Sequence, residues 1–238
     1  MAGNEGQTTQ SNNAAAENFS IRVTALSPLH LGSGKGDVTI DAEVVHDAVG
    51  LPYFPAKRLK GLLYESALEV VEIMDADPIF SEDEVKALFR HGTKTRTGAQ
   101  LIVSNLHLEN YETMRREWSF LEDRYPELIQ PRDVLEQYTS LRYQTKIDAN
   151  TRMAADTSLH NMRVVDKNVV FTGTLSLLQA EDTDRLILAF AVRNLERAGL
   201  KRNRGFGRIR CELQDPNGAD AGAAFIEKAL DTWKEGGC

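Results

Sequence analysis

Cysteine is scarce in this sequence, with only Cys211 and Cys238 among 238 residues. Two cysteines are too few for a disulfide framework or a four-ligand zinc site, so we expect both to be free thiols in a reducing compartment. No stretch approaches the roughly 18 apolar residues of a membrane-spanning helix. The first residues also lack the basic and apolar segments of a secretory signal. These absences predict a cytoplasmic protein that does not contact a membrane.

Positive charge is also in deficit. The chain has 28 Lys and Arg against 35 Asp and Glu, a net charge of -7. An acidic average disfavours a nucleic-acid-binding function, but such binding needs only local positive potential. The charges are segregated: residues 69–84 hold seven carboxylates and no Lys or Arg, whereas residues 200–210 hold five Lys or Arg and no acid. The distribution therefore predicts one basic face on an acidic protein.

The length suits one domain with insertions. Residues 1–18 are polar and are expected to form a disordered tail, followed by a single domain over 19–235 with insertions at about 75–98 and 134–161. Apolar residues alternate in some segments and recur at helical spacing in others, without strict alternation of strand and helix. This mixture predicts an α+β fold with an antiparallel sheet and helices on one side. The expected strands cover 19–25, 39–46, 100–108, 164–178 and 206–213, and the expected helices 55–74, 111–125, 182–198 and 222–234.

A glycine-rich loop over residues 28–36 follows the first expected strand and runs on to Ile40-Asp41. Glycines let a backbone approach a ligand closely and can form anion-binding nests. The spacing fits neither the Walker phosphate loop nor the dinucleotide-binding fingerprint. A plain surface loop is the alternative interpretation. The candidate binding residues of this loop are His30, Gly32, Gly34 and Lys35.

Two further segments concentrate positive charge. Lys57, Arg58 and Lys60 lie in the first turns of the helix that begins after Pro55, where free amides and cations together favour phosphate; a solvated helix start is the alternative. The second segment, residues 199–208, combines clustered cations with glycines and an aromatic ring, which suits phosphate pairing and base stacking; a basic turn is the alternative. Its candidates are Lys201, Arg202, Arg204, Gly205, Phe206 and Gly207.

In their order, these segments resemble the RAMP superfamily of CRISPR-associated proteins. The carriers are a Leu-His-x-Gly-x-Gly loop followed by Ile-Asp, a Gly-x-Pro-Tyr-x-Pro…Leu-Lys-Gly helix start, and an Arg-x-Arg-Gly-Phe-Gly loop. A fourth segment, Lys-Ile-Asp-x-x-Thr from Lys146 followed by Ala154 and Arg163-Val-Val165, looks like the thumb-flanking segment of type III backbone subunits and adds Lys146 and Arg152 to the RNA-binding candidates. The resemblance covers roughly residues 21–213.

The resemblance implies a modified RNA-recognition (ferredoxin-like) fold with a projecting thumb hairpin. It also implies a subunit that binds CRISPR guide RNA beside neighbouring RAMP subunits in a type III effector complex. In target-cleaving members the aspartate of the Ile-Asp motif cuts the complementary target RNA, which implies a catalytic, metal-binding role for Asp41, with Asp37 as second choice, and Mg²⁺ or Mn²⁺ as cofactor. The sequence departs from the family where Glu43 replaces a usual proline and where Ala-Lys-Arg replaces Gly-Ser-Ser after Pro55.

Three functions remain open from the sequence. The chain is a backbone subunit that cleaves target RNA as an endoribonuclease, a structural RAMP subunit that binds RNA without cutting, or a guide-processing RAMP endoribonuclease. The third class usually has a histidine-centred site and two tandem ferredoxin-like halves. This sequence shows one clear half, and His46, His91, His107 and His160 have no metal-ligand spacing.

Overall fold

The computed structural model describes residues 16–34, 36, 40–74, 79–90, 98–145, 159–202 and 204–236. Its main sheet has the strand order β2-β6-β1-β7, with the short β3 also paired to β6, and every pairing is antiparallel. The strands of this sheet are β1 (Ala16–Ala25), β2 (Gln100–Val103), β3 (His107–Leu108), β6 (Val170–Leu178) and β7 (Ile209–Gln214). β1 and β6 form its centre.

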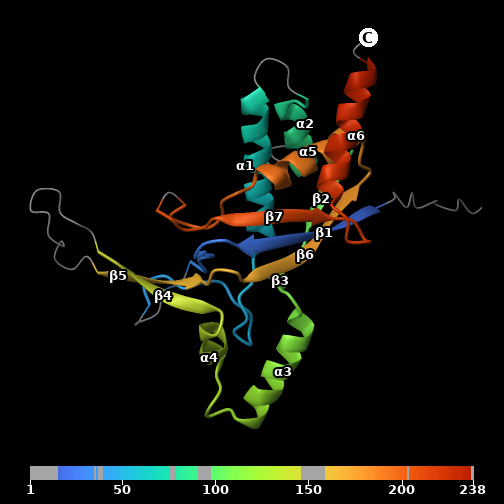
Figure 1. The fold of residues 1–238 in the computed structure, drawn as a ribbon. Coiled ribbons are helices and arrows are strands. Elements are labelled where there is room, and N and C mark those ends of the chain that lie inside the picture. Colours follow the sequence, from blue (N-terminus) through green and yellow to red (C-terminus); the bar gives the residue numbers. More distant parts are fainter. Residues whose placement is uncertain are drawn as a thin grey trace, which may run out of the picture.

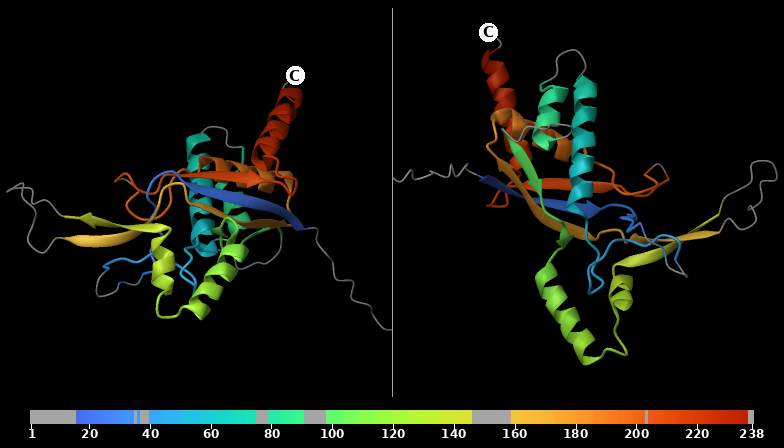
Figure 2. Two further views of the ribbon diagram at one scale, coloured as in Figure 1. Left: turned by 60° about the horizontal axis from the view of Figure 1, so that its bottom comes forward. Right: turned by 180° about the vertical axis from the view of Figure 1, so that it is seen from behind.

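Along the chain, the framework elements run β1, α1 (Ala56–Met74), β2, β6, α5 (Asp182–Asn194) and β7. This βαββαβ order with β1 and β6 at the centre is the ferredoxin-like arrangement, so the predicted fold class is confirmed. The helices α1, α2 (Glu82–Phe89), α5 and α6 (Ala221–Gly236) gather on one side of the sheet (Figures 1 and 2). None of the described helices is long and apolar enough to cross a membrane.

The core lies between this helical layer and one face of the sheet. In β1, Phe19, Ile21 and Val23 are buried, while the intervening side chains are partly exposed. Strand geometry places alternate side chains on opposite faces, so one face joins the core and the other stays polar. In α1, residues such as Leu59 and Leu63 form the matching buried stripe at helical spacing.

Two segments differ from the sequence-based expectations. Of the strand expected over 39–46, the described residues 40–46 form none: Val44 bridges to Gly32, Ala42 bridges in parallel to Met162, and His46 bridges to Pro52. Because this segment pairs with three different partners, it does not form one continuous ladder. β1 begins at Ala16, so residues 16–18 of the expected tail belong to the sheet.

The chain between β3 and β6 contains α3 (Tyr111–Arg124), α4 (Pro131–Glu136) and a separate hairpin of β4 (Thr139–Gln144) and β5 (His160–Val165), so it is longer than the insertion expected over 134–161. The hairpin projects away from the main sheet (Figure 1). The expected thumb began at Val134, but Val134 is buried and belongs to the hydrophobic core. The projecting part therefore starts after α4, and residues 146–158 lie outside the described residues.

Candidate functional site

The two glycine-containing segments predicted to bind RNA lie side by side. The Gly207 N–H donates to the Pro28 carbonyl at 2.9 Å, and the Leu200 N–H donates to the His30 carbonyl at 3.2 Å. Gly207 adopts a left-handed φ of +76°, and a Cβ there would stand 2.0 Å from the Ala198 carbonyl oxygen. Only glycine satisfies both the φ angle and the close approach, so this position fixes how the two loops meet.

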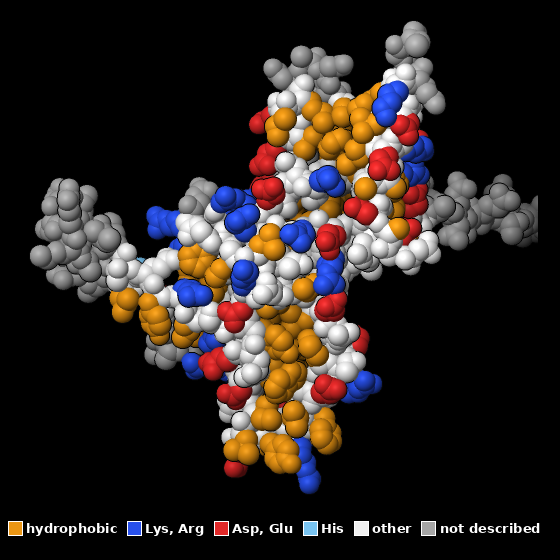
Figure 3. Space-filling view, viewed as in Figure 1, with side chains coloured by type: hydrophobic (Ala, Val, Ile, Leu, Met, Phe, Trp, Pro, Cys, Tyr) orange, Lys and Arg blue, Asp and Glu red, His pale blue; other side chains and the backbone are white. Residues whose placement is uncertain are grey.

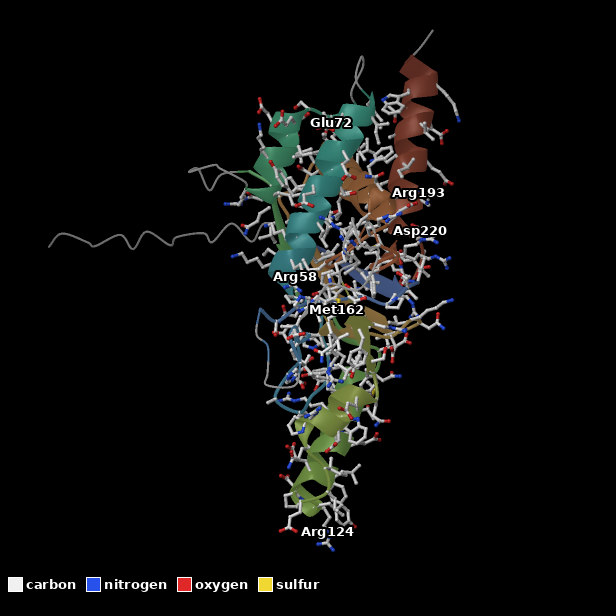
Figure 4. The ribbon with its side chains drawn as sticks, turned by 90° about the vertical axis from the view of Figure 1, so that its left-hand side faces the viewer. Arg58, Glu72, Arg124, Met162, Arg193 and Asp220 are labelled. Atoms are coloured by element: carbon white, nitrogen blue, oxygen red, sulfur yellow. The ribbon has the colours of Figure 1, made fainter. Side chains whose placement is uncertain are left out.

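The start of α1 completes the arrangement. Arg58 donates from Nη2 to the Gly32 carbonyl at 2.8 Å, and its Nη1 is buried with no hydrogen-bond partner among the described residues. A cleft of about 640 Å³ opens here, lined by the glycine loop, residues 41–43, Arg58, Leu62, Gly199 and Leu200. In Figure 4, Arg58 lies at the lower end of α1 with Met162 below it.

His30 forms part of the inner wall of this cleft and is 1% exposed. Its Nδ1 lies 2.7 Å from the carbonyl oxygen of Arg163. A carbonyl only accepts, so Nδ1 carries the proton and donates. Burial lowers the pKa of His30, and the nearby cations of Arg58 and Lys201 lower it further. The ring is therefore neutral near pH 7, with its lone pair on Nε2.

Arg163 connects several parts of the site and is the largest fully buried side chain. Its Nε lies 3.0 Å from a Glu43 carboxylate oxygen, its Nη1 donates to the Thr139 hydroxyl at 3.2 Å, and its Nη2 lies 3.4 Å from Glu136. Its own N–H donates to the Ala42 carbonyl at 2.9 Å. Glu43, which replaces the family's usual proline, is thus the partner of a buried cation.

In the sequence, Arg163 lay in a family-like segment but was given no role in the site. Its signal was an arginine among apolar residues of β5, between Met162 and Val164, because such an arginine is buried only with acidic or hydrogen-bonding partners.

Asp41 lies at the rim of the cleft, with its side chain 57% exposed. Its carboxylate accepts from the Asn161 N–H at 2.8 Å, and its own N–H donates to the Asn161 side-chain oxygen at 2.9 Å. The Nδ1 of His160 stands 3.8 Å from the same carboxylate. Reciprocal bonds thus hold Asp41 beside Asn161, near the Gln144–His160 end of the β4–β5 hairpin. Asp37, the second choice, lies outside the described residues.

Three of the remaining cations form an exposed rim: Lys201, Arg202 and Arg204, in the loop before β7. Lys57 is exposed at the start of α1. Figure 3 shows Lys and Arg side chains gathered over the loop before β7 and acidic side chains along α1. A second cleft of about 840 Å³ adjoins the first at Leu62 and lies between these two groups.

Within this rim, Arg202 lies 3.7 Å from Glu65 on α1, and Lys201 bonds the Gln144 side chain of β4. Gly205 has a φ of +81° with no atom within 4 Å of a Cβ position, and Phe206 is half-buried. The tip of the loop is therefore open to a ligand.

Lys60 does not join the cleft. Its ammonium donates to the Leu101 carbonyl of β2 at 2.8 Å, and burial lowers its pKa. This predicted RNA-binding residue supports the sheet instead. Gly34 does line the cleft. Lys35, Lys146 and Arg152 lie outside the described residues. Within the described part of the chain, no three His, Cys, Asp or Glu side chains are grouped so as to hold a metal ion.

Comparison with known proteins gives a consistent result. The family model of the RAMP superfamily matches residues 22–210. A chain from the cryo-EM structure of the type III-B Cmr-beta bound to cognate target RNA aligns with a TM-score of 0.60 and 16% identity, covering 84% of this chain and 97% of that chain. A chain of the apo-state type III-B Cmr-beta structure aligns at 0.56 and 13%, covering 83% and 96%. No curated protein matches the sequence significantly.

Proposed function

Because the chain belongs to the RAMP superfamily, we propose that it is an RNA-binding backbone subunit of a type III CRISPR effector complex. It holds guide RNA in the cleft between the glycine loop, α1 and the loop before β7, beside neighbouring RAMP subunits. The observation that carries this proposal is the convergence of three sequence-distant segments on one cleft, with exposed cations lining the second cleft that adjoins it. The overall acidity of the chain then matters little, because phosphate responds to local potential.

The open face of the sheet is a weaker candidate for RNA. RNA-recognition domains stack bases on aromatic side chains of that face. Here the corresponding positions of β1 and β6 carry Ser20, Arg22, Thr172 and Thr174, and Arg22 is already paired with Glu109. The loops, rather than the sheet, are therefore the proposed binding surface.

Purification with bound nucleic acid tests this assignment. The protein should retain RNA of a defined length after nuclease treatment, and binding of a labelled single-stranded RNA should weaken as salt rises, because phosphate contacts release counterions. Absence of co-purifying RNA together with salt-independent binding would reject it.

We further propose that Asp41 supports cleavage of bound target RNA. RNA supplies its own nucleophile: the 2′-oxygen bonds to the adjacent phosphorus as the 5′-oxygen leaves, giving a cyclic phosphate and a 5′-hydroxyl. The hairpin that positions Asp41 would hold the splayed nucleotide in line for this step. Asp41 offers one exposed carboxylate, which fits the habit of Mg²⁺, and of similar Mn²⁺, of using one or two carboxylates together with phosphate oxygens and water. The ion would stabilise charge on the phosphate oxygens.

The Asp41→Asn variant tests cleavage. It keeps the shape of the side chain and an oxygen for the Asn161 N–H, so binding should persist while cutting of a complementary labelled RNA by the assembled complex falls at least about a hundredfold. A chelator should have the same effect on the wild type. Full activity of Asp41→Asn would exclude Asp41 and direct attention to Asp37.

One observation favours a non-catalytic structural subunit as the second candidate. The Asp41 carboxylate is already engaged with the Asn161 backbone, so its role can be to fix the hairpin. Normal target binding by the wild type without any cleavage would support this alternative.

A further inference from the structure

His30 presents an unusual polar group to the cleft. The side chain is 1% exposed, yet only its Nδ1 is used internally, in the bond to the Arg163 carbonyl. No described residue hydrogen-bonds its Nε2. Because this nitrogen borders the cleft and has no partner among the described residues, it is available to accept a hydrogen bond from a ligand.

The hydrogen bond made by Nδ1 determines whether Nε2 donates or accepts. Donation from Nδ1 leaves Nε2 as an acceptor, and burial, together with the nearby cations, lowers the pKa of the ring and favours its neutral form. Around it, backbone groups already have partners: the Gly32 carbonyl accepts from Arg58, and the His30 carbonyl accepts from Leu200. His30 Nε2 is therefore a neutral acceptor on this wall, close to the cations of Arg58 and Lys201.

Glycine keeps this acceptor accessible. A Cβ at Gly32 would stand 2.6 Å from Nε2, and a Cβ at Gly199 would stand 2.6 Å from the His30 carbonyl oxygen. Both glycines line the same cleft as His30. Any side chain at Gly32 would collide with the ring and cover its free nitrogen.

We propose that His30 Nε2 accepts a hydrogen bond from a ribose 2′-hydroxyl, and that this contact makes the cleft selective for RNA over DNA. Phosphate oxygens and fluorine cannot donate to a neutral acceptor, whereas the 2′-hydroxyl both donates and distinguishes the two nucleic acids. The inference rests on the proposed RNA-binding function and specifies which atom of the ribose is read.

Three oligouridylates of equal length test the proposal on the full-length protein: 2′-hydroxyl, 2′-deoxy and 2′-fluoro. The fluoro form keeps the sugar pucker of RNA but cannot donate. One lost hydrogen bond per reading site should weaken binding of both modified strands by roughly five- to tenfold relative to RNA. Fluoro binding as tight as RNA binding would overturn the proposal, because pucker or an acceptor at the 2′ position would then suffice.

The His30→Asn variant removes the acceptor selectively. The Asn amide can still donate to the Arg163 carbonyl, in place of Nδ1, but has no group at the position of Nε2. The variant should bind all three strands with nearly equal, weakened affinity, whereas His46→Asn, which changes an exposed histidine, should keep the full preference for RNA. Retained preference in His30→Asn would refute the assignment.

The outcomes separate this inference from the function on which it rests. Equal binding of the three strands to the wild type refutes ribose reading and leaves RNA binding intact. Failure to bind any strand refutes both. If His30→Asn does not fold, the comparison of fluoro and hydroxyl strands on the wild type still decides the question.

Discussion

The inner wall of the cleft and its rim carry different kinds of predicted binding residue. On the inner wall, His30 and Arg58 donate to backbone carbonyls, at 2.7 Å and 2.8 Å. On the rim, Arg202 and Arg204 are exposed. A sequence motif does not distinguish the two kinds, because both are polar residues near glycines. The difference shows that the inner wall builds the cleft, while the rim supplies charge that a polyanion can use.

Two glycines of the loop before β7 test the difference between positions that build the cleft and positions that are open to a ligand. Their substitution should give the largest change in stability of the proposed variants. Gly205 and Gly207 both have positive φ, but only Gly207 faces backbone, with a Cβ position 2.0 Å from a carbonyl oxygen. Gly205→Ala should cost roughly 1–2 kcal/mol from left-handed strain alone. Gly207→Ala should cost about 3 kcal/mol or more, because backbone must also move. Equilibrium urea unfolding of the two variants measures both values.

Equal destabilisation by the two alanines would contradict this distinction. RNA binding adds a second readout: Gly205→Ala should keep most of the affinity of the wild type, since its Cβ position is open, whereas Gly207→Ala should lose it by separating the two loops.

Arg163 provides the next largest effect. Arg163→Met leaves the Glu43 carboxylate, whose side chain is 19% exposed, without its cation, and should lower the free energy of unfolding by about 2–3 kcal/mol. Adding Glu43→Gln to this variant should recover part of the loss, because the uncompensated charge is then removed. Additive destabilisation in the double variant would show that the pair is not coupled.

The framework of the fold was predictable from the sequence, since apolar alternation marks β1 and β6 and helical spacing marks α1. The orientation of Lys60 away from the cleft was predictable in principle, although Lys60 was named from the sequence as an RNA-binding candidate. Residues two apart on a helix point about 200° apart, so Arg58 and Lys60 cannot line the same cleft. The segment over 40–44 was not predictable in this way, because its pairing depends on Met162, which is 120 residues away for Ala42.

Charge on the rim should affect binding and not stability. Arg202→Ala and Arg204→Ala should each lower the slope of log affinity against log salt by about 0.7, while changing the free energy of unfolding by less than about 0.5 kcal/mol. Arg124→Ala, at the far end of α3 (Figure 4), is a matched control and should change neither. If Arg204→Ala behaves like Arg124→Ala, the rim is not in contact with phosphate.

Lowering the pH should decrease the free energy of unfolding by a small amount, because His30 of the inner wall takes up a proton more readily in the unfolded chain. Burial lowers the pKa of His30 in the folded protein, so the unfolded chain, with an ordinary value of about 6.5, takes up the proton first as the pH falls. The stabilisation from a neutral His30 is therefore complete above pH 6.5 and is lost as the pH decreases towards the folded-state pKa, with a slope of at most about 1.4 kcal/mol per pH unit. His107, whose pKa burial also lowers, contributes with the same sign.

The wild type and His30→Asn contain the same carboxylates and the same His107. The difference between their pH dependences of stability therefore isolates the contribution of His30. Urea unfolding of both proteins between pH 7.5 and pH 5 should give a shallower decline of stability for His30→Asn. Parallel curves for the two proteins would mean that His30 takes up its proton equally in both states. The pH dependence of stability would then give no support for a neutral His30 acceptor on the inner wall. The inner wall and the rim would differ only in how their side chains pack.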